Sequence, residues 1–378
     1  MMKKWIERID RKYILLGSTL ISVLLALVLV TCVGNPGGSA QVEAPDVGIL
    51  DKFDMFMTNT ISDSLDGILS IEKVYWLNDD DLVAPKPDQS LFGEMDEAID
   101  MKPVLEDAKD LIHGDRLYFD PDTTELMPYT DVLYYHDDTI LVITWKEVHD
   151  KSVYTFSEVF IAHPSQFRRF LAGGEYGSEK QFITTEMAAS VNAVLASSGD
   201  FYRFRNYGTI VYDGQVQRIR SNQVDTCFID DKGDLIFTYA GEITDKDEAQ
   251  KFVDENNIRF SMAFGPVLVD NGERCEPYDY ILGEVLDKFP RAALCQMGQL
   301  HYLVAVANWE APDYLHTPDI HMFAQRIAHT GCDKAYTLDG GQTAVIAMNG
   351  TLINKVHFGY QRQISDIFYF ATAIPDGG

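Results

Sequence analysis

The sequence has few basic residues for its length, and this shortage restricts its partners. Lysine and arginine account for 31 of the 378 residues, against 58 aspartates and glutamates, so the formal net charge at pH 7 is −27. No dense block of lysine or arginine follows the first dozen residues. A surface of this charge repels polyanions, so we expect no nucleic acid among the partners. Any phosphate group would have to be bound by a few local arginines.

Metal-binding patterns are also missing from the sequence. The five cysteines form no CxxC pair, and the nine histidines form neither an HxxxH nor an HExxH pattern. A zinc site is therefore not expected. The triplet Asp79-Asp80-Asp81 lacks the glycine and the distal glutamate of an EF-hand loop, which favours a solvated turn. No cofactor is predicted, although a divalent cation such as calcium, held by carboxylates, stays open.

The cysteines allow two interpretations. Cys227, Cys275, Cys295 and Cys332 lie far apart and at irregular spacing in the second half of the chain. In an oxidising compartment, four such residues can form two disulfides. Buried free thiols are the alternative, because a domain of this size does not need covalent cross-links and a free cysteine packs like a small apolar residue.

One apolar run, residues 13–33, is long enough to cross a membrane. At about 1.5 Å per residue it spans the hydrocarbon core of a bilayer. Basic residues precede the run and acidic residues follow it, which places residues 1–12 in the cytoplasm and the rest of the chain outside. A cleaved signal peptide ending near Ala40 is one alternative, although the run is long for such a peptide. A lipoprotein signal ending at Cys32 is a weaker one. We expect a single-pass membrane protein with an extracellular domain.

The rest of the chain divides into a linker, an extension and a main domain. Residues 34–48 are rich in glycine, proline and serine, which is typical of a linker. Residues 49–129 are acidic and mixed in pattern, and we interpret them as an N-terminal extension of the extracellular domain. Residues 130–378 contain short β-type runs separated by turn signals such as Asp213-Gly214 and Asn349-Gly350. Strands are expected at Val132–Tyr135, Thr139–Trp145, Val153–Ala162, Thr209–Tyr212, Leu235–Tyr239 and Tyr302–Ala307.

Helices are sparse among these strands. One is expected at about Thr185 to Ala196, and another begins at Pro318, capped by Thr317, and ends before Gly331. A few helices among many strands predict an α+β, sheet-rich domain.

The most informative stretch is residues 335–370. A strand ending at Leu338 is followed by Asp339-Gly340-Gly341, a short apolar segment and the turn Asn349-Gly350. A carboxylate followed by two glycines at a strand end exposes backbone N–H groups and allows a ligand to approach closely. By itself such a triplet is more often a simple turn.

Several motifs in order resemble the phosphodiester glycosidase family. The sequence LDGG, about four apolar residues, NGxxxNK and then Gln361-Arg362-Gln363-Ile364-Ser365 is similar to the end of these domains. Residues 158–164, residues 184–208 and Pro290-Arg291 resemble earlier segments of the same family. The resemblance therefore covers roughly residues 130–375.

The sequence departs from the family pattern at five positions, one of which is Thr343, where serine is expected. Ser198 stands where asparagine is expected, Ala292 where threonine is expected, Gln342 where glycine is expected, and Gln363 where proline is usual. These departures concern catalytic competence rather than the fold.

The resemblance implies a sugar-1-phosphodiester substrate and a set of site residues. Asp339 and Asp200 are the candidate catalytic carboxylates, and Arg291 and Arg362 are candidates for binding the phosphodiester. Each of these residues has a structural alternative, as a salt-bridge partner, a cap or a turn residue. The further candidates for substrate binding are Gly199, Gly340, Gly341, Thr343 and Ser365.

Two functions from different classes follow from this reasoning. The first is a membrane-anchored extracellular hydrolase that cleaves a sugar-1-phosphodiester in envelope polysaccharide metabolism. The second is a catalytically degenerate module of the same fold that binds glycan or takes part in envelope assembly. A separate partner-binding role for residues 49–129 rests only on their acidic composition.

Overall fold

A computed structural model describes residues 98–106, 117–119, 126–128, 130–149, 151–220, 223–276, 286–309 and 317–373. All of these belong to one compact unit, Val47–Gly378. The predicted membrane helix, the linker, Cys32 and the elements expected before residue 98 lie outside the described residues. Within the described ranges, no helix combines the length and apolarity needed to cross a membrane.

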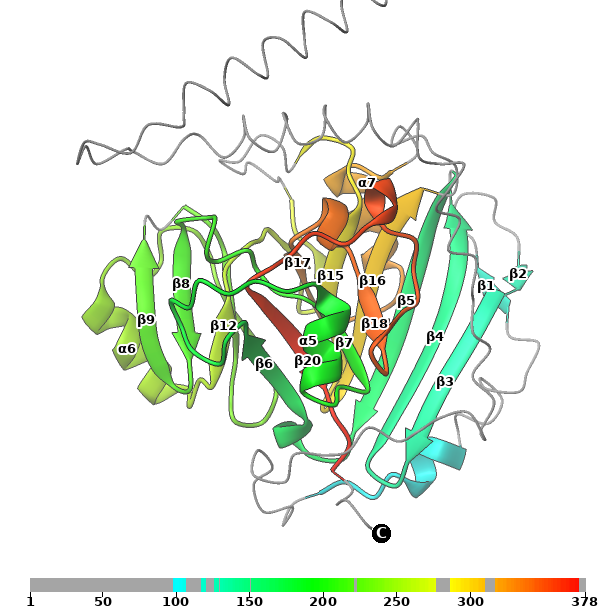
Figure 1. The fold of residues 1–378 in the computed structure, drawn as a ribbon, viewed down its shortest axis with the longest axis horizontal. Helices are drawn as coiled ribbons and strands as arrows, with labels where there is room; N and C mark the ends of the chain where they lie inside the picture. Colours follow the sequence, from blue (N-terminus) through cyan, green and yellow to red (C-terminus); the bar gives the residue numbers. More distant parts are fainter. Residues whose placement is uncertain are drawn as a thin grey trace, which may run out of the picture. The chain divides into compact units, whose positions relative to one another are not determined.

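The larger layer is an eight-stranded antiparallel sheet with the order β14-β13-β17-β15-β16-β5-β4-β3 (Figure 1). Its long strands have buried residues on both faces, which explains why successive residues such as Ile140–Ile143 are apolar. The strands are β3 (Thr130–Asp137), β4 (Ile140–His149), β5 (Ser152–Ile161), β13 (Val267–Asp270), β14 (Glu273–Arg274), β15 (Arg291–Gly298), β16 (His301–Trp309) and β17 (Lys334–Leu338).

A five-stranded sheet packs against one face of the larger sheet. Its order is β19-β18-β7-β20-β6, and every neighbouring pair is antiparallel. Phe167 from this sheet stacks on Phe370 and packs against Tyr302 of the larger sheet, with ring centroids 4.7 and 5.0 Å apart. The main apolar core therefore lies between the two sheets. The strands are β6 (Phe167–Leu171), β7 (Leu195–Ser198), β18 (Ile346–Met348), β19 (Thr351–Leu352) and β20 (Asp366–Phe370).

Helices cover the outer faces of both sheets. Helix α7 (Ile320–Ala328) packs Phe323 and Ile327 on the larger sheet, and α5 (Thr184–Ser190) packs Met187 on the smaller one. The result is a four-layer α/β/β/α arrangement. A separate apolar cluster joins α6 (Lys246–Glu255) to β8 (Gly208–Tyr212), β9 (Gln215–Arg220) and β10 (Thr226–Ile229). The remaining elements are β1 (Leu117–Phe119), β2 (Leu126–Pro128), β11 (Leu235–Thr238), β12 (Phe260–Met262) and the short 3-10 helices Pro164–Gln166, Gly341–Thr343 and His357–Gly359.

Most of the predicted strands and turns are confirmed. The six predicted strands correspond to β3, β4, β5, β8, β11 and β16. Asp213-Gly214 and Asn349-Gly350 each have positive φ at both residues and join β8 to β9 and β18 to β19, as the hairpin signal requires. The sheet-rich fold with few helices is thus observed.

Two helix predictions need correction. The helix expected to extend to Ala196 ends at Ser190, because Asn192 takes a left-handed φ of 51° and Leu195 to Ser198 pair with β18 and β20 as strand β7. The second helix is capped by Asp319 rather than by Thr317, since the Asp319 carboxylate accepts a hydrogen bond from the Met322 N–H at 2.9 Å. Helix α6, which Asp245 caps, was not predicted.

The four cysteines of the domain, Cys227, Cys275, Cys295 and Cys332, are free thiols. Three of them are buried in the apolar clusters, and Cys275 is half-buried. Of the two interpretations of the cysteines, two disulfides or free thiols, the structure confirms the free thiols.

Candidate active site

Two neighbouring strand ends bring Arg291 and Asp339 together. Strands β15 and β17 are antiparallel, with Ala292 opposite Leu338, so Arg291 begins one strand where Asp339 follows the other. The Gly341 N–H donates a hydrogen bond to the Pro290 carbonyl at 2.9 Å. A Cβ on Gly340 would overlap that same carbonyl oxygen. The first glycine after Asp339 therefore permits a close backbone contact that fixes both strand ends.

Gly340→Ala is expected to destabilise the domain by about 1–3 kcal/mol, because the added methyl forces the two strand ends apart. Gly298→Ala is the matched control: Gly298 also lies on β15, and its Cβ would meet no atom within 4 Å. The control should change stability by less than about 0.5 kcal/mol. Urea unfolding of both variants measures the difference, and equal midpoints would refute the close-contact argument.

Asp339 forms an ion pair with Arg362. The Arg362 Nη2 lies 2.5 Å from the Asp339 Oδ2, and its guanidinium lies over the Phe201 ring at 4.3 Å from the centroid. The Arg362 side chain is 26% exposed and that of Asp339 is 10% exposed. Phe201 in turn stacks on the exposed Phe204. The ion pair is thus partly accessible to solvent and lies on an aromatic support.

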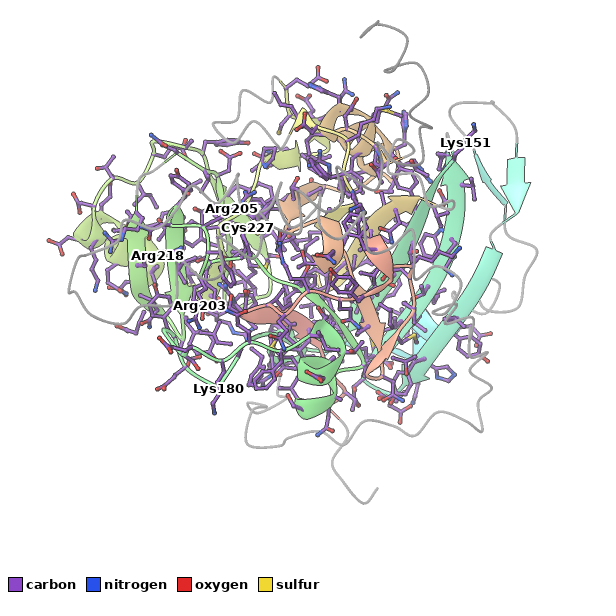
Figure 2. All side chains as sticks on the ribbon, turned by 45° about the horizontal axis from the view of Figure 1, so that its top comes forward. Lys151, Lys180, Arg203, Arg205, Arg218 and Cys227 are labelled. Carbon is purple, nitrogen blue, oxygen red and sulfur yellow. The ribbon has the colours of Figure 1, made fainter. Side chains whose placement is uncertain are left out.

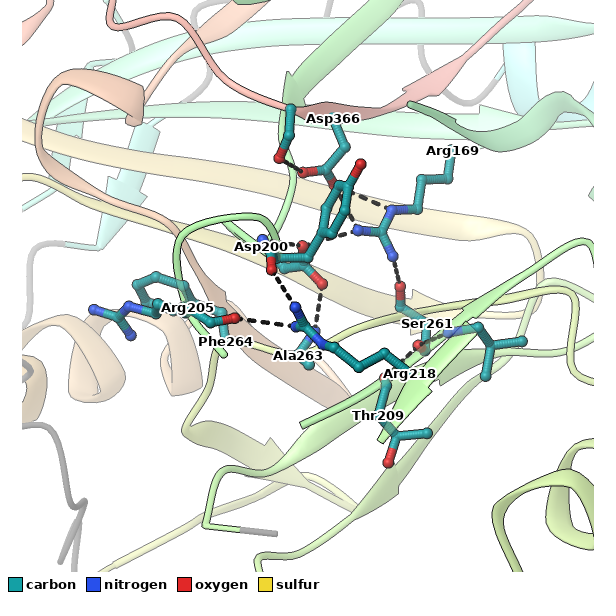
Figure 3. Close-up of polar contacts among 12 residues, drawn as sticks. Arg169, Asp200, Arg205, Thr209, Arg218, Ser261, Ala263, Phe264 and Asp366 are labelled. Atoms are coloured by element: carbon teal, nitrogen blue, oxygen red, sulfur yellow. Dashed lines mark hydrogen bonds and ion pairs between the residues drawn. The ribbon is translucent and has the colours of Figure 1, made fainter. Parts of the chain in front are cut away.

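Arg205 adds a third arginine to this region. Arg291 is buried, and burial lowers its pKa to about 10, with Asp319 and Asp287 raising the pKa and the Arg205 charge lowering it further. Arg291 therefore keeps its charge at pH 7 beside a second guanidinium. Arg205 lies over the Phe264 ring at 4.1 Å, and Figures 2 and 3 show it on the loop after β7. Positive charge gathers here in a strongly acidic chain.

The sequence reasoning missed Arg205, although a signal was present. Residues 184–208 already resembled the family, and the segment Phe201-Tyr202-Arg203-Phe204-Arg205 places two arginines among aromatic rings. Rings of this kind can support a guanidinium face to face.

Thr343 and Ser365, predicted to contact substrate, have hydroxyls engaged within the protein. The Thr343 Oγ1 donates to the Gly340 carbonyl at 2.6 Å, and the Ser365 Oγ donates to Asp366 at 3.4 Å. Both residues are buried. Ser198 supports the same loop, since its Oγ donates to the Thr343 carbonyl at 2.5 Å. The Thr343 and Ser198 hydroxyls therefore shape the loop around Asp339.

Asp200 lies in a buried ion-pair triad with Arg169 and Asp366 (Figure 3). The Arg169 Nη2 is 2.8 Å from a carboxylate oxygen of each aspartate, and all three side chains are at most 1% exposed. Asp200 also accepts hydrogen bonds from the N–H groups of Tyr202 and Ala263. The triad therefore fixes the start of the loop that carries Phe201 and Arg205.

Gly199 is required by this packing. A Cβ at Gly199 would overlap the Asp366 carboxylate, and the Gly199 N–H donates to the Asp366 carbonyl at 3.1 Å. The Gly199 carbonyl accepts a hydrogen bond from the Asp339 N–H at 3.3 Å. Asp200 and Gly199 thus connect the triad to Asp339 through the backbone. Arg169 and Asp366 were not predicted, although Arg169 interrupts the apolar residues of β6 and Asp366 directly precedes those of β20.

Burial raises the pKa of Asp366 to about 7, with Arg169 opposing the rise and Asp200 adding to it. The native state therefore binds a proton at a pH where the unfolded chain, with an ordinary carboxyl pKa, has lost it. Stability is then expected to fall as pH rises from about 4 to about 7 and to level off above that. Asp366→Asn should make this fall shallower, as measured by urea unfolding at a series of pH values. Asp231→Asn, an exposed control, should keep the wild-type slope, and parallel curves for all three proteins would contradict the assignment.

The carboxylates of the site face arginines rather than one another. Asp339 pairs with Arg362, and Asp200 pairs with Arg169. Among residues with described side chains, no group of three or more histidines, cysteines, aspartates or glutamates is arranged to hold a metal ion. Because the Asp339 carboxylate is paired with Arg362, this site suits an anion better than calcium.

Comparison with known proteins identifies a family for part of the chain. The sequence model of the phosphodiester glycosidase family matches residues 191–371, which include Asp200, Arg291, Asp339 and Arg362. No curated protein matches the sequence.

Solved structures similar to this chain include three with 11–16% sequence identity. The catalytic domain of zebrafish N-acetylglucosamine-1-phosphodiester alpha-N-acetylglucosaminidase, auto-inhibited by its pro-peptide, has 16% identity and a TM-score of 0.48, covering 62% of this chain and 83% of that one. A hypothetical protein from Synechocystis has 11% identity, coverages of 63% and 64%, and a TM-score of 0.44. A putative exported protein from Burkholderia pseudomallei has 12% identity, coverages of 58% and 74%, and a TM-score of 0.39. On the family match, residues 191–371 of this chain form a domain of the phosphodiester glycosidase family.

Proposed function

We propose that this protein hydrolyses a sugar-1-phosphodiester. The observation that carries the proposal is the Asp339–Arg362 ion pair within the family domain, at the strand end where the backbone of Arg291 lies opposite that of Asp339. Cleavage of such a bond requires positive charge at the phosphate and a carboxylate near the attacking water. The strand ends supply both kinds of group in one place.

Each charged side chain has a role in the proposed reaction. Arg362 and Arg291 bind the anionic oxygens of the phosphodiester, for which a planar guanidinium is well suited. Water attacks the anomeric carbon, the bond from that carbon to the phosphate oxygen breaks, and its electron pair stays on the phosphate. The arginines stabilise this charge, and the Asp339 carboxylate takes the proton of the attacking water.

Backbone and aromatic groups complete a sugar site. Gly341 has a φ of 62°, and no atom lies within 4 Å of the position its Cβ would occupy, so a sugar ring can approach the backbone there. Phe204 and Tyr360 are large exposed rings. Phe204 stacks on Phe201, whose ring lies under Arg362, and Tyr360 stands two residues before Arg362 in the sequence. Exposed rings of this kind offer a flat apolar surface to the C–H face of a sugar.

Two of the departures from the family pattern, Ser198 and Ala292, lie in the supporting structure. Ser198 hydrogen-bonds the backbone of the loop around Asp339, and Ala292 is fully buried in β15 opposite Leu338. Neither substitution removes a charged group from the ion-pair cluster. This favours a catalytic protein over the degenerate binding module.

The proposed setting is the outer face of a membrane. The apolar run at residues 13–33 and the basic residues before it support an anchored chain whose domain is extracellular. Teichoic-type and capsular polymers of a cell envelope contain sugar-phosphate linkages of the required kind, and we propose such a polymer as the substrate.

A substrate panel tests the proposal. The purified full-length chain in detergent is incubated with UDP-sugars and sugar-1-phosphate diesters, with and without calcium, and released sugar is measured. Turnover of at least one diester is expected, without a calcium requirement. Binding of a glycan with no turnover across the panel would instead establish the non-catalytic module.

A further inference from the structure

Two of the free thiols, Cys295 and Cys332, lie in the same apolar cluster beneath helix α7. Cys295 belongs to β15 and is opposite Ala335 of β17, on the face of the larger sheet that packs against this helix. Cys332 lies in the turn between α7 and β17. Both cysteines are at most 1% exposed. Two segments that are distant in the sequence therefore each place a sulfur in one buried space.

The backbone brings these two cysteines side by side. The Asp333 N–H donates a hydrogen bond to the Gln296 carbonyl at 2.9 Å, so the residue after one cysteine contacts the residue after the other. The Cys332 Sγ donates to the Ile327 carbonyl of α7 at 3.6 Å. This contact turns the Cys332 side chain back under the helix, toward the sheet face on which Cys295 lies.

The two sulfurs are hydrogen-bonded to each other, with Cys295 as the donor. Burial raises the pKa of the Cys295 thiol, and the hydrogen bond to Cys332 raises it further. The same hydrogen bond lowers the pKa of the Cys332 thiol, while burial opposes this effect. Because the thiolate is the nucleophilic form of cysteine, Cys332 is the more reactive sulfur of the pair.

The other two thiols of the domain have different surroundings. Cys227 is on β10 and packs in the core between the two sheets, away from the cluster beneath α7. Cys275 is half-buried and forms a hydrogen bond with the Tyr239 side chain. In the part of the chain that the structure describes, a contact between two cysteine sulfurs is therefore found for Cys295 and Cys332 alone.

We propose that Cys295 and Cys332 form a disulfide when the protein meets a disulfide oxidant, such as oxidised glutathione or a disulfide-carrying protein. The Cys332 thiolate attacks one sulfur of the oxidant, which forms a mixed disulfide and releases a thiolate. Cys295 then loses its proton, and its sulfur attacks that of Cys332 and releases the second thiolate. The two cysteines lose two protons and two electrons, and the oxidant ends as two thiols. The thiols described here are the reduced form of this pair.

The position of Cys332 lets an oxidant reach it. Its neighbours in the turn, Gly331 and Asp333, are exposed. An opening confined to this turn is enough to bring the buried sulfur to solvent, and both sulfurs are accessible while the chain folds. The outer face of a membrane, which is the setting proposed above, is an oxidising compartment in which disulfides persist.

The disulfide fastens β15 to the turn that leads into β17. These two strands hold Arg291 and Asp339 at their other ends. The bond closes a loop of the chain from residue 295 to residue 332, and a closed loop restricts the unfolded state more than the native state. Oxidation should therefore raise the midpoint of urea unfolding by about 1 M.

Peptide mapping of the full-length chain in detergent tests the disulfide. The protein is incubated with oxidised glutathione, either folded or during refolding from urea, and the remaining thiols are then alkylated under denaturing conditions. Trypsin cleaves after Arg326, so Cys295 and Cys332 fall in separate peptides that only a disulfide joins. Mass spectrometry should find these two peptides joined, with Cys227 and Cys275 alkylated. Alkylation of both Cys295 and Cys332 in both samples would overturn the proposal.

Urea unfolding of oxidised and reduced protein tests the effect on stability. Cys332→Ala should lose the rise in midpoint on oxidation. Cys227→Ala, which removes a buried thiol from the other core, is the matched control and should keep the rise. An equal rise in both variants would show that the pair does not cause it. These measurements use no substrate, so the disulfide and the proposed hydrolysis are tested independently.

Discussion

Asp339→Asn is expected to lower turnover of a sugar-1-phosphodiester by about 100- to 10,000-fold, the usual contribution of a general base. Asparagine keeps the size of aspartate and an oxygen that can accept the Arg362 hydrogen bond. It cannot take a proton from the attacking water. Because the arginines that bind the phosphodiester remain, KM should change much less than kcat. Initial rates of sugar release by the two purified proteins measure the effect.

Asp231→Asn is the matched control for this experiment. It removes the same charge from an exposed residue of the turn between β10 and β11. This turn carries none of the site residues Arg291, Asp339 and Arg362. Its turnover should equal that of the wild type. If Asp339→Asn were as active as the control, Asp339 would have no role in the chemistry.

Arg169→Met is expected to have the largest effect on stability, a loss of about 3–5 kcal/mol. Methionine fills much of the arginine volume but leaves Asp200 and Asp366 buried without a positive partner. Both carboxylates are within 1% of complete burial and share one guanidinium nitrogen. Urea unfolding at pH 8, above the raised pKa of Asp366 in the wild type, measures the loss relative to a wild-type protein in which Asp366 is ionised.

Two further variants show whether the triad is responsible for this loss. Arg220→Met removes an exposed arginine at the end of β9 and should cost less than about 0.5 kcal/mol. Adding Asp200→Asn and Asp366→Asn to Arg169→Met should restore part of the lost stability, because no buried charge is then unpaired. A loss no greater for Arg169→Met than for Arg220→Met would show that the triad does not hold the loop.

The sequence predicts the larger sheet well because its strands are buried on both faces. Strand β4 begins with the apolar run Ile140–Ile143, in β16 only His301 and Asn308 are polar, and turn signals mark the ends. Strand β6 gives no such signal, since Phe-Arg-Arg-Phe-Leu carries two adjacent charges. One of them, Arg169, is compensated by carboxylates 31 and 197 residues away. A local sequence pattern cannot predict an ion pair between residues so far apart in the chain.

The candidate site likewise has residues that the sequence predicts and residues whose positions depend on distant contacts. Motif order alone placed Arg291, Asp339 and Arg362 in one family pattern, and the structure brings their backbone segments together. The supporting role of Asp200 depends on Arg169, and the position of Arg205 depends on the Phe264 ring in a distant loop. These contacts join segments whose own sequences are equally compatible with a solvent-exposed surface. The fold, rather than any motif, decides which arginines are buried.

The most direct test of the central claim is the fate of the water oxygen. A diester that the protein turns over is hydrolysed in water enriched in oxygen-18, and the phosphate product is analysed by mass spectrometry. Attack at the anomeric carbon, as proposed for Asp339 and its arginines, leaves the phosphate without label. A labelled phosphate would mean that water attacks phosphorus, and the protein would then be a phosphodiesterase rather than a glycosidase.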